Sequence, residues 1–134
     1  RMLAQSTQVK REDLPGVAVP GDEKIAAIRI SGPLFFAVAD RVLETVSLLR
    51  GVRVVILQMS RIESVDATGA RVLSDIVQTL EARGITVLIK GIRPGQAQLF
   101  KTVGVLDSLR HTKHLFDEMD DAVEHARSHL ARES

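Results

Sequence analysis

The sequence contains no cysteine, tryptophan or tyrosine, and it has only four phenylalanines in 134 residues. The absence of cysteine excludes disulfides, thiolate ligands for a metal and a cysteine nucleophile. So few aromatic rings cannot form the stacking platforms that bind single-stranded nucleic acid. No apolar run approaches the roughly 20 residues that a helix needs to cross a bilayer. Chemistry in this chain therefore depends on hydroxyl, carboxylate, imidazole or cationic side chains.

The charges are nearly balanced, with 18 lysines and arginines against 17 aspartates and glutamates and a formal net charge of +1. No long run of one sign occurs, so the charges give no reason to expect nucleic acid as a partner. Hydrophobic residues make up 45% of the chain and charged residues 26%, which is typical of a globular domain. The length suffices for one domain with its own core.

Short β-branched runs alternate along the chain with segments of helical periodicity. The expected strands span residues 17–20, 24–30, 52–59 and 85–90. The expected helices span residues 35–50, 66–84, 95–102 and 115–130, and residues 105–106 fit either a short strand or a turn. Strands that alternate with helices in this way predict a single α/β domain with a mainly parallel sheet.

The first 16 residues lack sustained periodicity and end in Pro15-Gly16. Such a segment is typical of a linker or arm. We therefore expect a linker over residues 1–16 and the domain over residues 17–132.

Histidine is the first candidate metal ligand. His125 and His129 lie four residues apart in the last expected helix, a spacing that can hold a metal ion. They lack the glutamate of the HExxH pattern and fall off the apolar stripe of that helix, so we expect exposed polar side chains. His111 and His114 lie in an expected loop and receive the same interpretation. No metal site is predicted.

A glycine-containing turn, GIRPGQAQLF, follows the strand that ends at Lys90. Backbone amides at a helix start, together with Arg93, could bind an anion. The turn is neither a Walker A loop nor a GxGxxG fingerprint, so a helix-capping turn is the preferred interpretation. A weak nucleotide site that uses Lys90 and Arg93 stays open as an alternative.

The stretch SRIESVDATGAR, residues 60–71, connects a buried strand to a helix. Asp66 can cap the free amides of that helix, and Gly69 permits close packing in its first turn. Thr68 then lies in the first turn with its hydroxyl near the surface. A phosphate there would meet the positive end of the helix dipole and add nearly two negative charges to the surface. A plain capped helix start explains the same residues. Nothing nearby supplies a histidine base for Ser60, Ser64 or Thr68, so no enzyme is indicated.

The segment VDATGARVL resembles the signature of STAS domains, the family of anti-sigma-factor antagonists and of the cytoplasmic tails of SulP anion transporters. The antagonists carry Asp-Ser-Ser/Thr-Gly at a helix start, and the second hydroxyl residue is phosphorylated by a partner kinase. Asp66, Thr68 and Gly69 match this pattern, and Ala67 replaces the first serine. The segment GPLFF, residues 32–36, is similar to the one that SulP tails carry before their first helix.

The resemblance implies a mainly parallel or mixed sheet of four to five strands flanked by about four helices. It also implies a non-catalytic regulatory domain without cofactor, on the cytoplasmic face of the cell membrane, after a membrane domain from which residues 1–16 lead. The expected cargo is sulfate, bicarbonate or a dicarboxylate. Expected partners are the transporter's own membrane domain and a cytosolic regulatory protein.

The expected regulatory surface comprises Ser64, Asp66, Thr68 and Gly69, with Arg61 and Arg71 as candidate contacts for a partner. The alternative is a free-standing anti-sigma-factor antagonist that is switched by phosphorylation at Thr68.

Overall fold

A five-stranded mixed sheet organises the computed structural model, which describes residues 7–34, 37–63, 67–92 and 115–133. The strands are β1 (Gln8–Glu12), β2 (Ile25–Gly32), β3 (Val54–Ile62), β4 (Thr86–Lys90) and β5 (Leu115–Phe116). They lie in the order β1-β2-β3-β4-β5. β2 to β5 are parallel to one another, and β1 pairs with β2 in the antiparallel sense. The expected α/β class with a mainly parallel sheet is confirmed.

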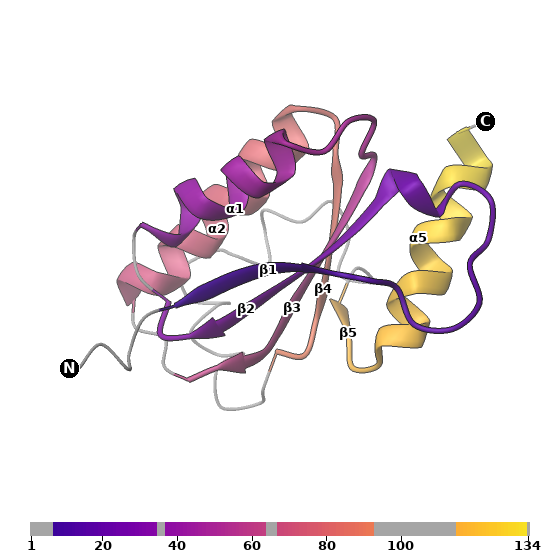
Figure 1. Ribbon diagram of the computed structural model, residues 1–134. Coiled ribbons are helices and arrows are strands. Elements are labelled where there is room, and N and C mark those ends of the chain that lie inside the picture. The colour runs from indigo at the N-terminus through magenta and orange to yellow at the C-terminus, as the bar shows by residue number, and fades with distance from the viewer. Residues whose placement is uncertain (1–6, 35–36, 64–66, 93–114, 134) are drawn as a thin grey trace.

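Helices cover both faces of this sheet (Figure 1). The described α-helices are α1 (Val38–Ser47), α2 (Ala67–Ala82) and α5 (Met119–Glu133), and a short 3-10 turn, η1, spans Asp22–Lys24. α1 and α2 lie on one face, and α5 lies on the other. Among the helices of the described segments, none combines the length and the hydropathy needed to span a membrane.

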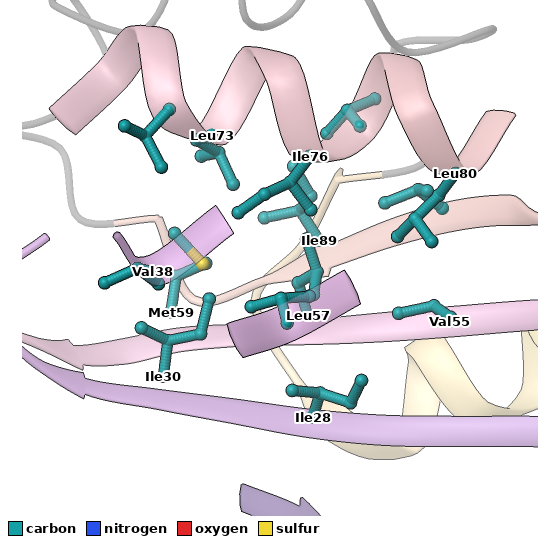
Figure 2. Packing of buried hydrophobic residues seen from close by; sticks show 14 of the residues in the cluster. Ile28, Ile30, Val38, Val55, Leu57, Met59, Leu73, Ile76, Leu80 and Ile89 are labelled. Carbon is teal, nitrogen blue, oxygen red and sulfur yellow. The ribbon is translucent and has the colours of Figure 1, made fainter. Parts of the chain in front are cut away.

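The larger core lies between the sheet and the α1–α2 pair (Figure 2). Alternate residues of the strands point to this face, which is why Ile28, Leu57 and Ile89 meet the helices. From α2, Leu73, Ile76 and Leu80 recur at helical spacing and face the strands. Because these side chains are fully buried, this layer contributes most of the apolar surface that folding removes from water.

The smaller core lies on the opposite face, under α5. Ile25, Val54, Ile56 and Leu88 contact Ala122, Val123 and Ala126 of the helix. The ion pair of Arg127 with Asp22 fixes the helix against η1, with Nε to Oδ1 at 3.0 Å and Nη2 to Oδ2 at 2.8 Å. The hydrogen bond from Arg127, helped by the backbone amide of Val19, lowers the pKa of Asp22 below its ordinary value, although desolvation opposes the shift.

Several boundaries differ from those expected. Val17–Pro20 forms no strand, because β1 occupies the edge beside β2 and leaves the Val17 side chain 87% exposed. β1 itself lies within the range assigned to a linker; its sequence, QVKRE, is too polar to be recognised as a strand. Leu115–Phe116 belongs to β5, so α5 begins four residues later than predicted. The helix expected at residues 95–102 and residues 105–106 lie outside the described residues.

Candidate functional site

The predicted regulatory residues belong to the segment that runs from the end of β3 to the first turn of α2. β3 ends at Ile62, the amide of Glu63 donates to the carbonyl of Gly32 at 3.0 Å, and α2 begins at Ala67. Ser64 and Asp66 lie outside the described residues. Thr68, in the first turn of α2, is exposed, whereas Gly69 is buried. The surface position expected for the Thr68 hydroxyl therefore agrees with the structure.

Gly69 lies where the start of α2 touches the segment that follows β2. A Cβ atom added at Gly69 would lie 2.7 Å from the carbonyl oxygen of Leu34 and 3.3 Å from the Leu34 Cβ. Leu34 is itself buried, and the neighbouring Pro33 carbonyl accepts a hydrogen bond from the hydroxyl of Thr7. The motif ending in Gly69 and the segment beginning at Gly32 are thus in direct contact, although they are far apart in the sequence.

Exposed residues of α2 form one stripe that begins at Thr68. Arg71 and Asp75 follow at helical spacing and are exposed, while Ala70 and Val72 are buried. Because Arg71 lies three residues after Thr68, it is close enough to meet a negative charge placed there. Arg61, near the end of β3, is also exposed, but it lines a pocket with Lys90 and not this stripe. This surface therefore presents the hydroxyl residue Thr68 and the cation of Arg71 one helical turn apart.

Lys90, the candidate for a nucleotide or anion site, lies on the other face of the sheet. It alternates with Ile89, which faces the α1–α2 core, and its Nζ donates to the Ser60 hydroxyl at 3.0 Å. Arg93 lies outside the described residues. Gly91 has φ +87° and approaches Ser60 so closely that a Cβ at this position would overlap the Ser60 Oγ. The structure thus separates Lys90 from the Thr68 surface.

A row of polar side chains across three neighbouring strands was missed in the sequence. Arg29 of β2 is the register partner of Gln58 of β3, which is the partner of Lys90 of β4. Glu12 of β1 joins the row, because its Oε2 lies 3.1 Å from Arg29 Nη1 and its Oε1 accepts from Gln58 Nε2 at 3.3 Å. In the sequence, each of these residues is only a polar side chain that follows an apolar run. They form a row only when the register of the sheet aligns the three strands.

The histidines of α5 differ from the expectation of exposed side chains. His125 and His129 are half-buried, and their ring centroids lie 4.9 Å apart. The His125 ring also contacts Phe116 at 5.3 Å between centroids. The reason is that β5 precedes α5 closely and places Phe116 beside the helix. Within the described residues, no cluster of three or more potential metal ligands occurs.

The comparisons with known proteins agree with the fold. The STAS domain family matches residues 17–122. The chain belongs to this family, which confirms the resemblance seen in the sequence.

Solved structures of two kinds are similar to this chain. The SulP transporter STAS domain of Vibrio cholerae is 22% identical, with a TM-score of 0.73 over 86% of this chain and 88% of that one. A sulfate transporter family protein of Wolinella succinogenes is 29% identical, with a TM-score of 0.71 over 88% and 93%. The unphosphorylated anti-sigma-factor antagonist SpoIIAA is 15% identical, with a TM-score of 0.64 over 90% and 97%. The comparison with curated protein sequences gives no match.

Proposed function

We propose that this chain is the cytoplasmic regulatory domain of a SulP-type anion transporter that carries sulfate, bicarbonate or a dicarboxylate. The observation that carries the proposal is the 29% identity to the sulfate transporter family protein across 88% of the chain. The buried contact of Leu34 with Gly69 supports it, because it joins the transporter-like segment to the family's turn. The two signatures therefore belong to one packed unit.

In this proposal the domain performs no catalysis and acts through contacts. The exposed stripe of Thr68 and Arg71 forms the contact surface for the transporter's membrane domain or for a cytosolic regulatory protein. Charged residues at the rim of a contact steer association and set specificity. A change of charge on this stripe would then alter transport without unfolding the domain.

Transport by the native gene product tests this surface. Arg71→Glu is expected to change the rate of radiolabelled sulfate, bicarbonate or dicarboxylate uptake in cells, with an unchanged amount of protein in the membrane fraction. Arg41→Glu is the matched control, because Arg41 is an exposed arginine on α1 that undergoes the same charge change. Equal uptake by both variants and by the wild type for every cargo would argue against a regulatory contact at the Thr68 stripe.

The exposed hydroxyl of Thr68 favours a second candidate, a free-standing anti-sigma-factor antagonist. Its position in the first turn of α2 suits a phosphate, because the positive end of the helix dipole stabilises negative charge. Incubation with the cognate anti-sigma kinase and ATP is the test. Label that appears on the wild type and on Ser47→Ala, an exposed hydroxyl on α1, but not on Thr68→Ala would support this candidate. An unlabelled wild type would remove it.

A further inference from the structure

The sheet face under α5 changes character along its strands. Its first part is apolar and is covered by the helix, through Ile25, Ile56 and Leu88. The next row on the same face is the polar one of Arg29, Gln58 and Lys90. Strands of a parallel sheet that is covered on both sides are normally apolar throughout. Polar side chains in such a row need hydrogen-bond partners or a ligand, because leaving them dry and unpaired is costly.

A pocket of ≈ 150 Å³ lies over this row, at the carboxyl ends of the parallel strands. In open α/β sheets this end is the usual place for ligands. Six residues line the pocket: Glu12, Arg29, Gln58, Ser60, Arg61 and Lys90. Three of them are cationic and one is a carboxylate. The lining therefore favours a negatively charged occupant.

Arg29 is a half-buried cation of the pocket, with 19% of its side chain exposed. One of its nitrogens, Nη1, pairs with Glu12. Its Nε is buried and has no hydrogen-bond partner among the residues that the structure describes. A guanidinium offers five donors and an ammonium three. Lys90 directs one of its three to Ser60. Within the part of the chain that the structure describes, the contacts of both cations therefore leave donors for an acceptor in the pocket.

We propose that this pocket, named here the cationic pocket, binds a small inorganic oxyanion such as sulfate, phosphate or bicarbonate. Arg29 and Lys90 contact the anion, and Arg61 adds positive charge at the rim. Charge-assisted hydrogen bonds of this kind are the strong ones in proteins. Glu12 orients Arg29 through its 3.1 Å ion pair and weakens binding by its own charge.

Size and neighbouring charge limit the occupant. Pockets for drug-sized ligands measure roughly 300–1,000 Å³, so a volume of ≈ 150 Å³ suits an anion of a few atoms better than a nucleotide. The adjoining hollow shares Glu12 and Gln58 with the cationic pocket and adds three carboxylates, those of Asp13, Glu118 and Asp120. These carboxylates would repel an anion, which confines the site to the Lys90 side of Glu12. The proposal holds for a transporter domain and for a free antagonist alike.

Titration of the ¹⁵N-labelled 134-residue chain with sulfate, phosphate or bicarbonate tests the pocket. Sodium chloride keeps the ionic strength constant, because exposed charges respond to screening alone. The amides of Arg29, Gln58, Ser60 and Lys90 are expected to shift in a saturable way with at least one of the three oxyanions. Shifts that grow linearly, or that chloride reproduces, would mean general screening and would overturn the proposal.

Substitutions of both signs sharpen this test. Lys90→Gln and Arg29→Gln are each expected to lower the affinity for the anion by about tenfold or more, because each loses a charge-assisted hydrogen bond. Arg41→Gln, which removes a charge from α1, should leave the affinity unchanged. Glu12→Gln should tighten binding, whereas Glu44→Gln, its control on α1, should not. Arg29→Gln also loses the ion pair with Glu12 and could fail to fold for that reason. In that case Lys90→Gln, at a half-buried position, is the variant that tests the proposal.

Lipid headgroups carry phosphate groups with the same oxyanion chemistry. A second titration with lipid vesicles therefore distinguishes a free anion from a headgroup as the ligand. Vesicles of phosphatidylglycerol are added to the labelled chain in place of free anions. A response to vesicles with no response to free sulfate, phosphate or bicarbonate would overturn the proposal of a free anion. Unchanged affinity in Lys90→Gln would do the same, since it would place the bound anion elsewhere.

Discussion

The two faces of the sheet are built differently. On the α1–α2 face, apolar residues recur along most of each strand, from Ala26 to Ile30 on β2 and from Val55 to Ile62 on β3. On the α5 face, the apolar residues stop at the row of Ala27, Ile56 and Leu88, and the polar row with Arg29 and Gln58 follows. The first face is a continuous core. The second combines a small core with a polar end that opens into the cationic pocket.

This difference separates stability from recognition. Large side chains of α2 are fully buried against the sheet, and such burial is the main favourable term in folding. α5 contributes Ala122 and Ala126, which are small, and it relies in addition on its ion pair with η1. We therefore expect substitutions on the α1–α2 face to affect unfolding, and substitutions in the polar row to affect ligand binding.

The largest effect is expected from Ile76→Ala in α2. Ile76 is fully buried in the larger core, so its truncation should lower the free energy of unfolding by about 2–5 kcal/mol. Gln58→Ala in the polar row is the comparison and should cost less than about 1.5 kcal/mol, the value of one ordinary hydrogen bond. Urea denaturation measures both. Equal losses would contradict the division between the two faces.

Gly69→Ala is expected to have the next largest effect. Alanine in a helix normally stabilises by about 1 kcal/mol relative to glycine. Here the new Cβ would lie 2.7 Å from the Leu34 carbonyl oxygen, and overpacking of this kind costs about 1–3 kcal/mol. The free energy of unfolding should therefore fall, and Thr68→Ala next to it should change it little. A stabilised Gly69→Ala variant would refute the close contact between α2 and the segment after β2.

The ion pair of Asp22 with Arg127 tests how α5 is held. Because its hydrogen bond lowers the pKa of Asp22 in the folded state, the pair stabilises the fold above the ordinary aspartate pKa of about 3.9. This contribution is lost as the pH falls through the lower folded value. Asp22→Asn should therefore be less stable than the wild type near pH 7, and the two should converge in acid. Thermal unfolding at both pH values measures this, with Asp75→Asn on α2 as control. A difference in stability between Asp22→Asn and the wild type that stays the same at neutral and acid pH would count against the ion pair.

The smallest effect is expected from Thr68→Glu. The side chain is exposed at the start of α2, where a negative charge interacts favourably with the helix dipole. The free energy of unfolding should change by about 0.5 kcal/mol or less. Chemical denaturation of Thr68→Glu and Gly69→Ala under the same conditions compares the free energies of unfolding at the two neighbouring positions. A loss as large as that of Gly69→Ala would mean that Thr68 is not a surface position.

The sequence predicts the three longer parallel strands and the long helices well, because their apolar periodicity reflects which faces are buried. β2, β3, β4 and α2 lie where their apolar patterns indicate. β1 escapes prediction because its pairing with β2 depends on backbone hydrogen bonds, and its side chains are mostly charged. The contact of Leu34 with Gly69 and the polar row escape it for a related reason. Both join residues that only the register and the crossovers of the sheet bring together.

The most direct test of the proposed function is the size and location of the native gene product. An antibody against this domain is used on immunoblots of membrane and cytosolic fractions from the source cells. The proposal predicts a band much larger than 14.7 kDa, confined to the membrane fraction. A band of about the chain's own mass in the cytosol would contradict it and would favour the free antagonist with Thr68 as its switch.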